Sequence, residues 1–188
     1  MESLKFDKSS GLVSGARQVI SPNCDARPDS HDIRLLVVHG ISLPPGEFGG
    51  PWIDDLFCGR LDPAPHPYFA EIHGLKVSAH LLIRRDGELV QYVPLQLRAW
   101  HAGASSFCGR DGCNDYSIGI ELEGVDDVPY TPSQYAKLTG LSQMLMQAFP
   151  AITPARIVGH SDIAPGRKTD PGAAFDWPLF RRLLSEQQ

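Results

Sequence analysis

The segment HLLIRRDGELVQYV, residues 80–93, decides the fold class. Two runs of strand-forming residues, 80–85 and 88–93, flank the pair Asp86-Gly87. A type I′ turn needs positive φ at both central residues, so an Asp-Gly pair between two such runs is a strong signal for a β-hairpin. We therefore expect two antiparallel strands here, joined by a turn of this type.

Three further segments predict strands that can accompany the hairpin. Residues 34–39 (RLLVVH) are a short aliphatic run, which predicts a buried strand. In residues 117–122 (SIGIEL), aliphatic side chains alternate with Ser, Gly and Glu, so Glu121 lies on the face opposite the aliphatic set. Residues 157–158 predict a last short strand that ends at Gly159-His160.

Helices are predicted between these strands and after them. Apolar residues in 52–57 recur at i, i+1, i+4 and i+5, which favours a short amphipathic helix. The segment 131–134 (TPSQ) combines an N-cap Thr, Pro at the first helical position and Gln at the third, which is a capping-box pattern. Pro150 ends that helix, and Asp176 is placed to cap a final one.

Strands, a hairpin and helices therefore mix without a regular βαβ rhythm. This pattern predicts a mixed α/β (α+β) fold, in which helices pack on a single mixed central β-sheet. With 188 residues, 42% of them hydrophobic, the chain is long enough for one core, so we expect one domain over residues 1–188. Residues 1–30, which contain Pro22, Pro28 and several Asp and Ser, are expected to be irregular.

Charge and hydropathy restrict the class of partner. The formal net charge of -5 is a poor match for nucleic acid or an anionic membrane. The N-terminus mixes both charge signs without an apolar run, and no stretch approaches the roughly 18 apolar residues of a membrane span. These features predict a cytoplasmic protein that binds a small molecule or peptide, with no nucleic-acid or membrane partner. The sequence does not determine the oligomeric state, and a monomer is the default expectation.

The four cysteines form no C-x-x-C pair. In a cytosolic chain of this size, reduced thiols are the default. Cys108 and Cys113 are close enough in sequence for a metal pair or a disulfide, but the second half of a cysteine-rich zinc site is missing.

Candidate metal ligands stand at the ends of two predicted strands. A catalytic zinc ion needs about three protein ligands and an open position for water. His39 ends one strand, His160 ends another, and Asp170 follows in the segment RKTDPG. A lone histidine at a strand end is more often structural than a ligand, so the spacing alone leaves both interpretations open.

A set of short motifs runs in order through nearly the whole chain. The motifs are LVVH (36–39), ISLPPGEFGG (41–50), HPYF (66–69), VSAH (77–80), RRDG (84–87), WHAG (100–103), IGIELEG (118–124), GHSDIAP (159–165) and RKTDPG (167–172). In these motifs the chain resembles the AmpD amidases, cytosolic 1,6-anhydro-N-acetylmuramyl-L-alanine amidases. Their wider family includes peptidoglycan-recognition proteins and phage lysozyme-like amidases.

The resemblance implies an N-acetylmuramoyl-L-alanine amidase fold and one Zn²⁺ ion per chain, held by His39, His160 and Asp170. It implies hydrolysis of the amide bond between the lactyl group of (1,6-anhydro)-N-acetylmuramic acid and L-alanine in muropeptides, during peptidoglycan recycling. Glu121 matches the family's catalytic carboxylate, which holds water and transfers its proton. Lys168 matches the catalytic lysine, whose ammonium stabilises the oxyanion. The neighbouring Glu123 is the competing carboxylate.

Substrate contacts are expected from aromatic and cationic side chains. Aromatic rings can pack on sugar or peptide, although they are more often plain core. Cationic groups can meet the carboxylates of the stem peptide, although each is more often solvated. The candidates are Tyr68, Lys76, Trp100, His101, Arg110 and Arg167. His80, inside the hairpin, is expected to be structural.

Three departures from the familiar family pattern leave the expected metal ligands unchanged and bear on fine substrate preference and on the groups around those ligands. Gly40 replaces an Asn, Ser161-Asp162 replaces Cys-Asn, and Lys76 replaces an Arg, which substitutes a point charge for a bidentate fork. The Gly- and Pro-rich stretch 40–50 has the composition of a mobile lid. Two other functions remain to be tested: a peptidoglycan-binding module without catalysis, and an amidase that acts on polymeric cell wall.

Overall fold

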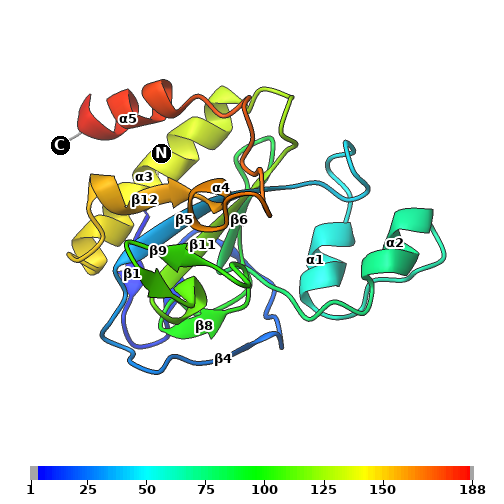
Figure 1. The fold of residues 1–188 in the computed structure, drawn as a ribbon, viewed down its shortest axis with the longest axis horizontal. Coiled ribbons are helices and arrows are strands. Elements are labelled where there is room, and N and C mark those ends of the chain that lie inside the picture. The colour runs from blue at the N-terminus through cyan, green and yellow to red at the C-terminus, as the bar shows by residue number, and fades with distance from the viewer. Residues whose placement is uncertain (1–3, 187–188) are drawn as a thin grey trace.

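The computed structural model describes residues 4–186 and contains a mixed central sheet with helices on both faces (Figure 1). Four strands of the sheet run parallel to one another, the fifth is antiparallel to its neighbour, and the sixth is parallel to the fifth. The mixed sheet that the sequence predicts is confirmed. In spatial order its strands are β12 (Ile157–Gly159), β5 (Leu35–Ile41), β11 (Ser117–Glu123), β6 (Leu81–Ile83), β7 (Leu89–Gln91) and β3 (Arg17–Gln18).

The predicted hairpin forms, but its turn differs from the predicted type. β6 and β7 pair antiparallel, with Leu82 opposite Val90. In the turn only Gly87 has positive φ, at 90°, and its N–H donates to the carbonyl of Arg84 over 2.9 Å. The type I′ prediction is therefore wrong. Residues 85–87 form a three-residue loop that ends in a left-handed glycine, which requires positive φ at one position.

The register of the two central strands places the candidate chemistry. β5 and β11 pair in parallel, with His39 opposite Glu121. The aliphatic side chains of β11 pack into the core with Leu36 and Val38 of β5. Because side chains alternate along a strand, His39 and Glu121 lie together on the other face.

Helices α3 (Pro132–Ala148) and α5 (Trp177–Glu186) cover the aliphatic face of the sheet (Figure 1). α3 begins with the predicted capping box: Gln134 N–H donates to Thr131 Oγ1 over 3.2 Å, and Thr131 N–H donates to Gln134 Oε1 over 3.0 Å. At the start of α5, Leu179 N–H donates to Asp176 Oδ1 over 2.8 Å, as predicted. These caps satisfy N–H groups that lack partners within a helix.

Two short helices lie beside the opposite face and form one wall of a cleft. α1 (Trp52–Phe57) and α2 (Pro67–Ile72) pack with Leu82 of β6 and with Val90 and Tyr92 of β7 and its extension. In Figure 1 they lie to the right of the sheet. The remaining helical turns are η1 (Cys113–Asp115), η2 (Pro154–Arg156) and α4 (His160–Ile163).

The expectation that residues 1–30 are irregular is wrong for the described part of that segment. β3 of this segment pairs with β7 and forms an edge of the central sheet, with Arg17 opposite Val90. Strands of two or three residues have no detectable alternation, and their partners are distant in sequence. The other short strands are β1 (Phe6–Asp7), β2 (Leu12–Val13), β4 (Cys24–Ala26), β8 (Leu97–Ala99), β9 (Ser106–Phe107) and β10 (Arg110–Asp111), paired β1 with β2, β4 with β8 and β9 with β10.

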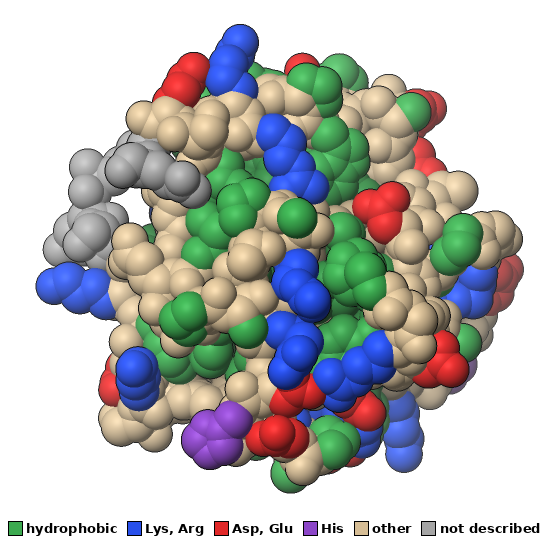
Figure 2. Space-filling model, turned by 60° about the vertical axis from the view of Figure 1, so that its left-hand side comes forward, with side chains coloured by type: hydrophobic (Ala, Val, Ile, Leu, Met, Phe, Trp, Pro, Cys, Tyr) green, Lys and Arg blue, Asp and Glu red, His purple; other side chains and the backbone are tan. Residues whose placement is uncertain are grey.

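The surface and the thiols add two observations. On the face in Figure 2, Lys and Arg side chains lie among hydrophobic and acidic ones. Within residues 4–186, no helix combines the length and apolarity that crossing a bilayer requires. The four cysteines are free, with Cys108 exposed and Cys113 buried, so the possible disulfide between them does not form.

Candidate active site

Two histidines and one aspartate from separate elements meet at one end of the sheet. His39 lies in β5, His160 opens α4 directly after β12, and Asp170 lies in the loop before α5. His39 Nδ1 is 3.0 Å from His160 Nδ1 and 3.2 Å from Asp170 Oδ2, and His160 Nδ1 is 3.1 Å from the same oxygen. Among the described residues, these side chains form a group that can hold a metal ion.

The spacing of these three atoms suits a tetrahedral metal ion. Zinc bonds of about 2.0–2.2 Å to nitrogen and oxygen place neighbouring ligand atoms about 3.3 Å apart. Burial is the main cause that lowers the pKa of His39 to about 4, so its imidazole is neutral near pH 7 and keeps a lone pair. At Asp170, burial raises the pKa, but contacts with His160 and His39 lower it by more, so the carboxylate is ionised.

Glu121 lies beside this group and lacks the partners that a buried carboxylate normally has. Its side chain is 8% exposed, and within residues 4–186 its Oε2 atom has no hydrogen-bond partner. Burial, and then the charge of Asp170, raise the pKa of Glu121 well above its ordinary value, while Lys168 opposes them. A carboxyl group of this kind can exchange a proton near neutral pH.

Lys168 provides the positive charge of the same cavity. It lines the cleft together with Glu121 and the three metal-site residues, and its backbone N–H donates to the carbonyl of Ala164. The residue itself is exposed, so its ammonium group can reach a substrate without a large desolvation cost.

The cleft around these residues has a volume of about 710 Å³. One wall is apolar and comes from the loop after β5, from α1 and α2, and from the segment 75–78. Asp126 and Asp127 also line the cleft. Three of the predicted substrate-binding residues, Tyr68, Trp100 and His101, line this cleft.

Comparison with known proteins identifies the family. The family model for N-acetylmuramoyl-L-alanine amidases matches residues 29–173, which include His39, His160, Asp170, Glu121 and Lys168. The chain belongs to the N-acetylmuramoyl-L-alanine amidase family.

Individual members of the amidase family match over nearly their whole length. The chain is 60% identical to the 1,6-anhydro-N-acetylmuramyl-L-alanine amidase AmpD of Escherichia coli K12 over 177 residues, which are 94% of this chain and 96% of that protein. It is 56% identical to the Haemophilus influenzae protein of the same name, over 93% of this chain and 95% of that protein. A crystal structure of a selenomethionine AmpD derivative superposes with a TM-score of 0.92 at 59% identity, covering 95% of this chain and 98% of that one.

Three cationic residues were expected to contact the substrate: Lys76, Arg110 and Arg167. None of them is among the described residues that line this amidase's cleft. Lys76 is exposed beside it. Arg110 donates from Nη1 to Asp32 over 2.5 Å and lies over the ring of Tyr116, 4.1 Å from its centroid. Arg167 donates from Nη2 to the carbonyls of Ala102 and Ala104 over 2.6 and 2.7 Å. The two arginines therefore hold protein groups.

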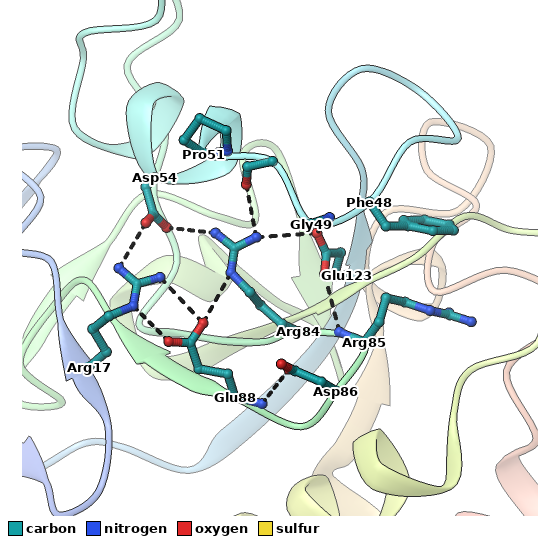
Figure 3. Close-up of a pocket in the computed structure, with 11 residues that line it drawn as sticks. Arg17, Phe48, Gly49, Pro51, Asp54, Arg84, Arg85, Asp86, Glu88 and Glu123 are labelled. Carbon is teal, nitrogen blue, oxygen red and sulfur yellow. Dashed lines mark hydrogen bonds and ion pairs between the residues drawn. The ribbon is translucent and has the colours of Figure 1, made fainter.

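The competing carboxylate, Glu123, lies in a different environment (Figure 3). Its oxygens accept hydrogen bonds from the backbone N–H groups of Gly49 and Arg85, over 2.7 and 3.1 Å, and from Arg84 Nη1 over 3.3 Å. Arg84 in turn contacts Asp54 and Glu88. Glu123 thus anchors Gly49 to the sheet, and the mobility expected for the stretch 40–50 remains a prediction.

His80, predicted to be structural, is fully buried between the sheet and the strand β8. Its Nδ1 atom accepts the N–H of Gly119 over 3.0 Å, and its Nε2 atom lies 3.0 Å from the carbonyl of Leu97. Sequence reasoning did not select the acidic pair Asp126 and Asp127, because no motif distinguishes them from an ordinary polar loop. Only the fold brings that loop to the cleft.

Proposed function

We propose that the chain is a zinc-dependent amidase that hydrolyses the bond between the lactyl group of 1,6-anhydro-N-acetylmuramic acid and L-alanine in muropeptides. The observation that carries this proposal is the convergence of His39, His160 and Asp170 beside Glu121, whose Oε2 atom has no hydrogen-bond partner within residues 4–186. The relatives named above support this substrate. A further relative, AmiD of Escherichia coli, was solved with anhydro-N-acetylmuramic acid-L-Ala-D-γ-Glu-L-Lys, and its structure matches with a TM-score of 0.58 at 28% identity, covering 97% of this chain and 66% of that one.

The donor set fits one zinc ion, which His39 and His160 would hold through Nδ1 and Asp170 through Oδ2. A bound zinc ion acts as a Lewis acid on a carbonyl group and lowers the pKa of a bound water to about 7.

Glu121 is the proposed general base and then general acid. Its carboxylate takes a proton from the attacking water, whose oxygen forms a bond with the lactyl carbonyl carbon. When the carbon–nitrogen bond breaks, Glu121 returns the proton to the nitrogen of L-alanine. The products are the lactyl carboxylic acid of the sugar and a peptide with a free amine, and near neutral pH the acid's proton passes to the amine. The raised pKa of Glu121 suits both directions of this transfer.

Lys168 is proposed to stabilise the negative charge that develops on the carbonyl oxygen. Tyr68, Trp100 and His101 are proposed to contact the substrate, because they line the cleft. We do not extend this role to Lys76, Arg110 and Arg167. We propose peptidoglycan recycling in the cytoplasm as the setting and a monomer as the active form. Cell fractionation and size-exclusion chromatography test these two points.

The decisive experiment is a mass-spectrometric assay on a purified anhydro-muropeptide. We expect release of the free peptide, loss of release after chelation, and recovery with added zinc. Binding of the muropeptide without release would identify a binding module instead. A rate on intact cell wall equal to that on the anhydro-muropeptide would show that the polymer is also a substrate. Undiminished release by fully metal-free protein would refute the mechanism.

A further inference from the structure

The second ring nitrogen of His39 begins a chain of hydrogen bonds that leads away from the metal site. His39 Nε2 is 2.9 Å from His101 Nδ1, and His101 Nε2 is 3.1 Å from Ser117 Oγ. Ser117 Oγ is 2.6 Å from the carbonyl oxygen of Cys113. The chain therefore connects a candidate ligand, through two side chains, to the backbone at the start of β11.

The carbonyl of Cys113, at the end of this series of hydrogen bonds, determines which atom donates and which accepts in each of them. A carbonyl oxygen only accepts, so the Ser117 hydroxyl donates to Cys113 and its oxygen is free to accept from His101 Nε2–H. A neutral imidazole has one donor and one acceptor, so His101 Nδ1 accepts from His39 Nε2–H. His39 Nδ1 then carries a lone pair, and this atom faces Asp170 and His160.

The ring of His101 is held in place from several sides. A Cβ atom on Gly119 would lie 2.5 Å from His101 Cγ, so the absence of a side chain there makes room for the ring. The backbone N–H groups of His101 and Ala102 both donate to Asn114 Oδ1, over 3.1 and 2.8 Å. The ring stands edge-on to His39, with 5.0 Å between centroids and 88° between planes.

His160 provides an internal parallel. Its Nε2 atom is 3.2 Å from the carbonyl of Ala102, which also accepts a hydrogen bond from Arg167. Nε2 therefore carries the proton, and Nδ1 faces the metal site. A backbone carbonyl thus sets the tautomer of both histidines, directly for His160 and through His101 and Ser117 for His39.

We propose that His101 and Ser117 are positioning residues that hold His39 in its Nε2–H tautomer, with Nδ1 directed to the metal ion. This proposal rests on the metal site of the proposed function. Groups that orient metal-bound histidines typically change metal affinity by about 10–100-fold when they are removed.

Two measurements on the full-length protein test the proposal. The first is zinc affinity, by competition with a chromogenic chelator. We expect about 10–100-fold weaker binding in Ser117→Ala and His101→Leu. His101→Asn should recover part of the loss, because its side-chain oxygen can accept from His39. Ser142→Ala is the matched control: it removes a fully buried hydroxyl that has no partner among residues 4–186, and its affinity should equal that of the wild type.

The second measurement is the ring ¹⁵N NMR spectrum of His39, with and without zinc. We expect a protonated Nε2 in the wild type and a mixture of tautomers in metal-free Ser117→Ala. A wild-type His39 protonated at Nδ1, or unchanged zinc affinity in Ser117→Ala, would overturn the proposal. If His101→Leu does not fold, Ser117→Ala and the wild-type spectrum still decide. A wild type that binds zinc through His39 Nδ1 but releases no peptide would refute the proposed activity and leave this inference standing.

Discussion

Glu121 and Glu123 are the same residue type, two positions apart on one face of β11, and their surroundings are opposite. Glu123 is 2% exposed and accepts three hydrogen bonds in a cluster where Arg84 balances its charge. Glu121 is 8% exposed and has an oxygen without a partner within residues 4–186. The strand therefore gives both side chains a rigid frame, and the partners decide which one stabilises the fold and which remains reactive.

The same contrast extends to the two cavities that these residues line. The cavity beside Glu123 has a volume of about 630 Å³. It is lined by Arg17, Arg84, Asp54 and Glu88, which ion pairs join (Figure 3). The cleft beside Glu121 instead gathers the acceptor atoms of His39, His160 and Asp170 at one point. In the first cavity the opposite charges are partners for one another, whereas the converging acceptor atoms in the cleft need a cation from outside the protein.

The largest expected effect is that of Asp170→Ala. The substitution removes the candidate ligand atom that lies within 3.2 Å of both histidine nitrogens. We expect the variant to lose bound zinc and turnover together, as measured by metal analysis and peptide release. Normal zinc content in a folded variant would show that Asp170 is not a ligand.

The next effect distinguishes the two glutamates by catalysis. Glu121→Gln cannot accept a proton from water, so kcat should fall by about 10²–10⁴-fold while zinc remains bound. Glu123→Gln is the matched control on the same strand and should retain most of the activity. A Glu121→Gln variant as fast as the wild type would remove Glu121 from the mechanism.

Lys168→Ala should lower kcat by about 10²–10³-fold, also with zinc bound.

Glu123→Gln should instead lower the free energy of unfolding. The substitution leaves the buried guanidinium of Arg84 with one fewer counter-charge, and breaking a buried ion pair in this way costs about 3–5 kcal/mol. Arg84 keeps Asp54 and Glu88, so the lower end of that range is expected. Urea unfolding measures the change. Unaltered stability would mean that these neighbours compensate fully.

The sequence predicted the parts of the fold that local chemistry determines. The capping box of α3, the cap of α5 and the aliphatic face of β11 depend on neighbouring residues, and all of them form. The strands β3 and β4 were missed because Arg17 pairs with Val90 and Cys24 with Ala99, far away in the chain. The turn type was wrong for a local reason: only Gly87 has positive φ, and the side chain of Asp86 accepts the N–H of Glu88.

In the candidate site, the motifs identified the site residues more reliably than they identified the groups that each side chain contacts. The three metal-site residues and Glu121 were selected from strand ends and motifs, and the structure places them together. Asp32 engages Arg110 and two backbone carbonyls engage Arg167, and the substrate contacts expected of both from charge alone remain predictions. Ser117 was not selected at all. A serine that begins a strand carries no sign of the histidine it meets.

The smallest expected effect concerns the pH dependence of stability at Glu121. Burial raises its pKa above the ordinary 4.5, so the folded chain keeps a proton that the unfolded chain releases. Stability should therefore fall as the pH rises through the window from 4.5 to the raised pKa.

The variant Glu121→Gln removes this contribution to the pH dependence of stability. It should match the wild type at the acidic end and become relatively more stable as the pH rises. Urea unfolding of chelator-treated protein between about pH 5 and 9 measures the difference. Zinc should reduce it, because a cation beside the carboxylate favours the charged form. Parallel stability curves for the two metal-free proteins would mean that Glu121 finds a partner in solution, and its contrast with Glu123 would disappear.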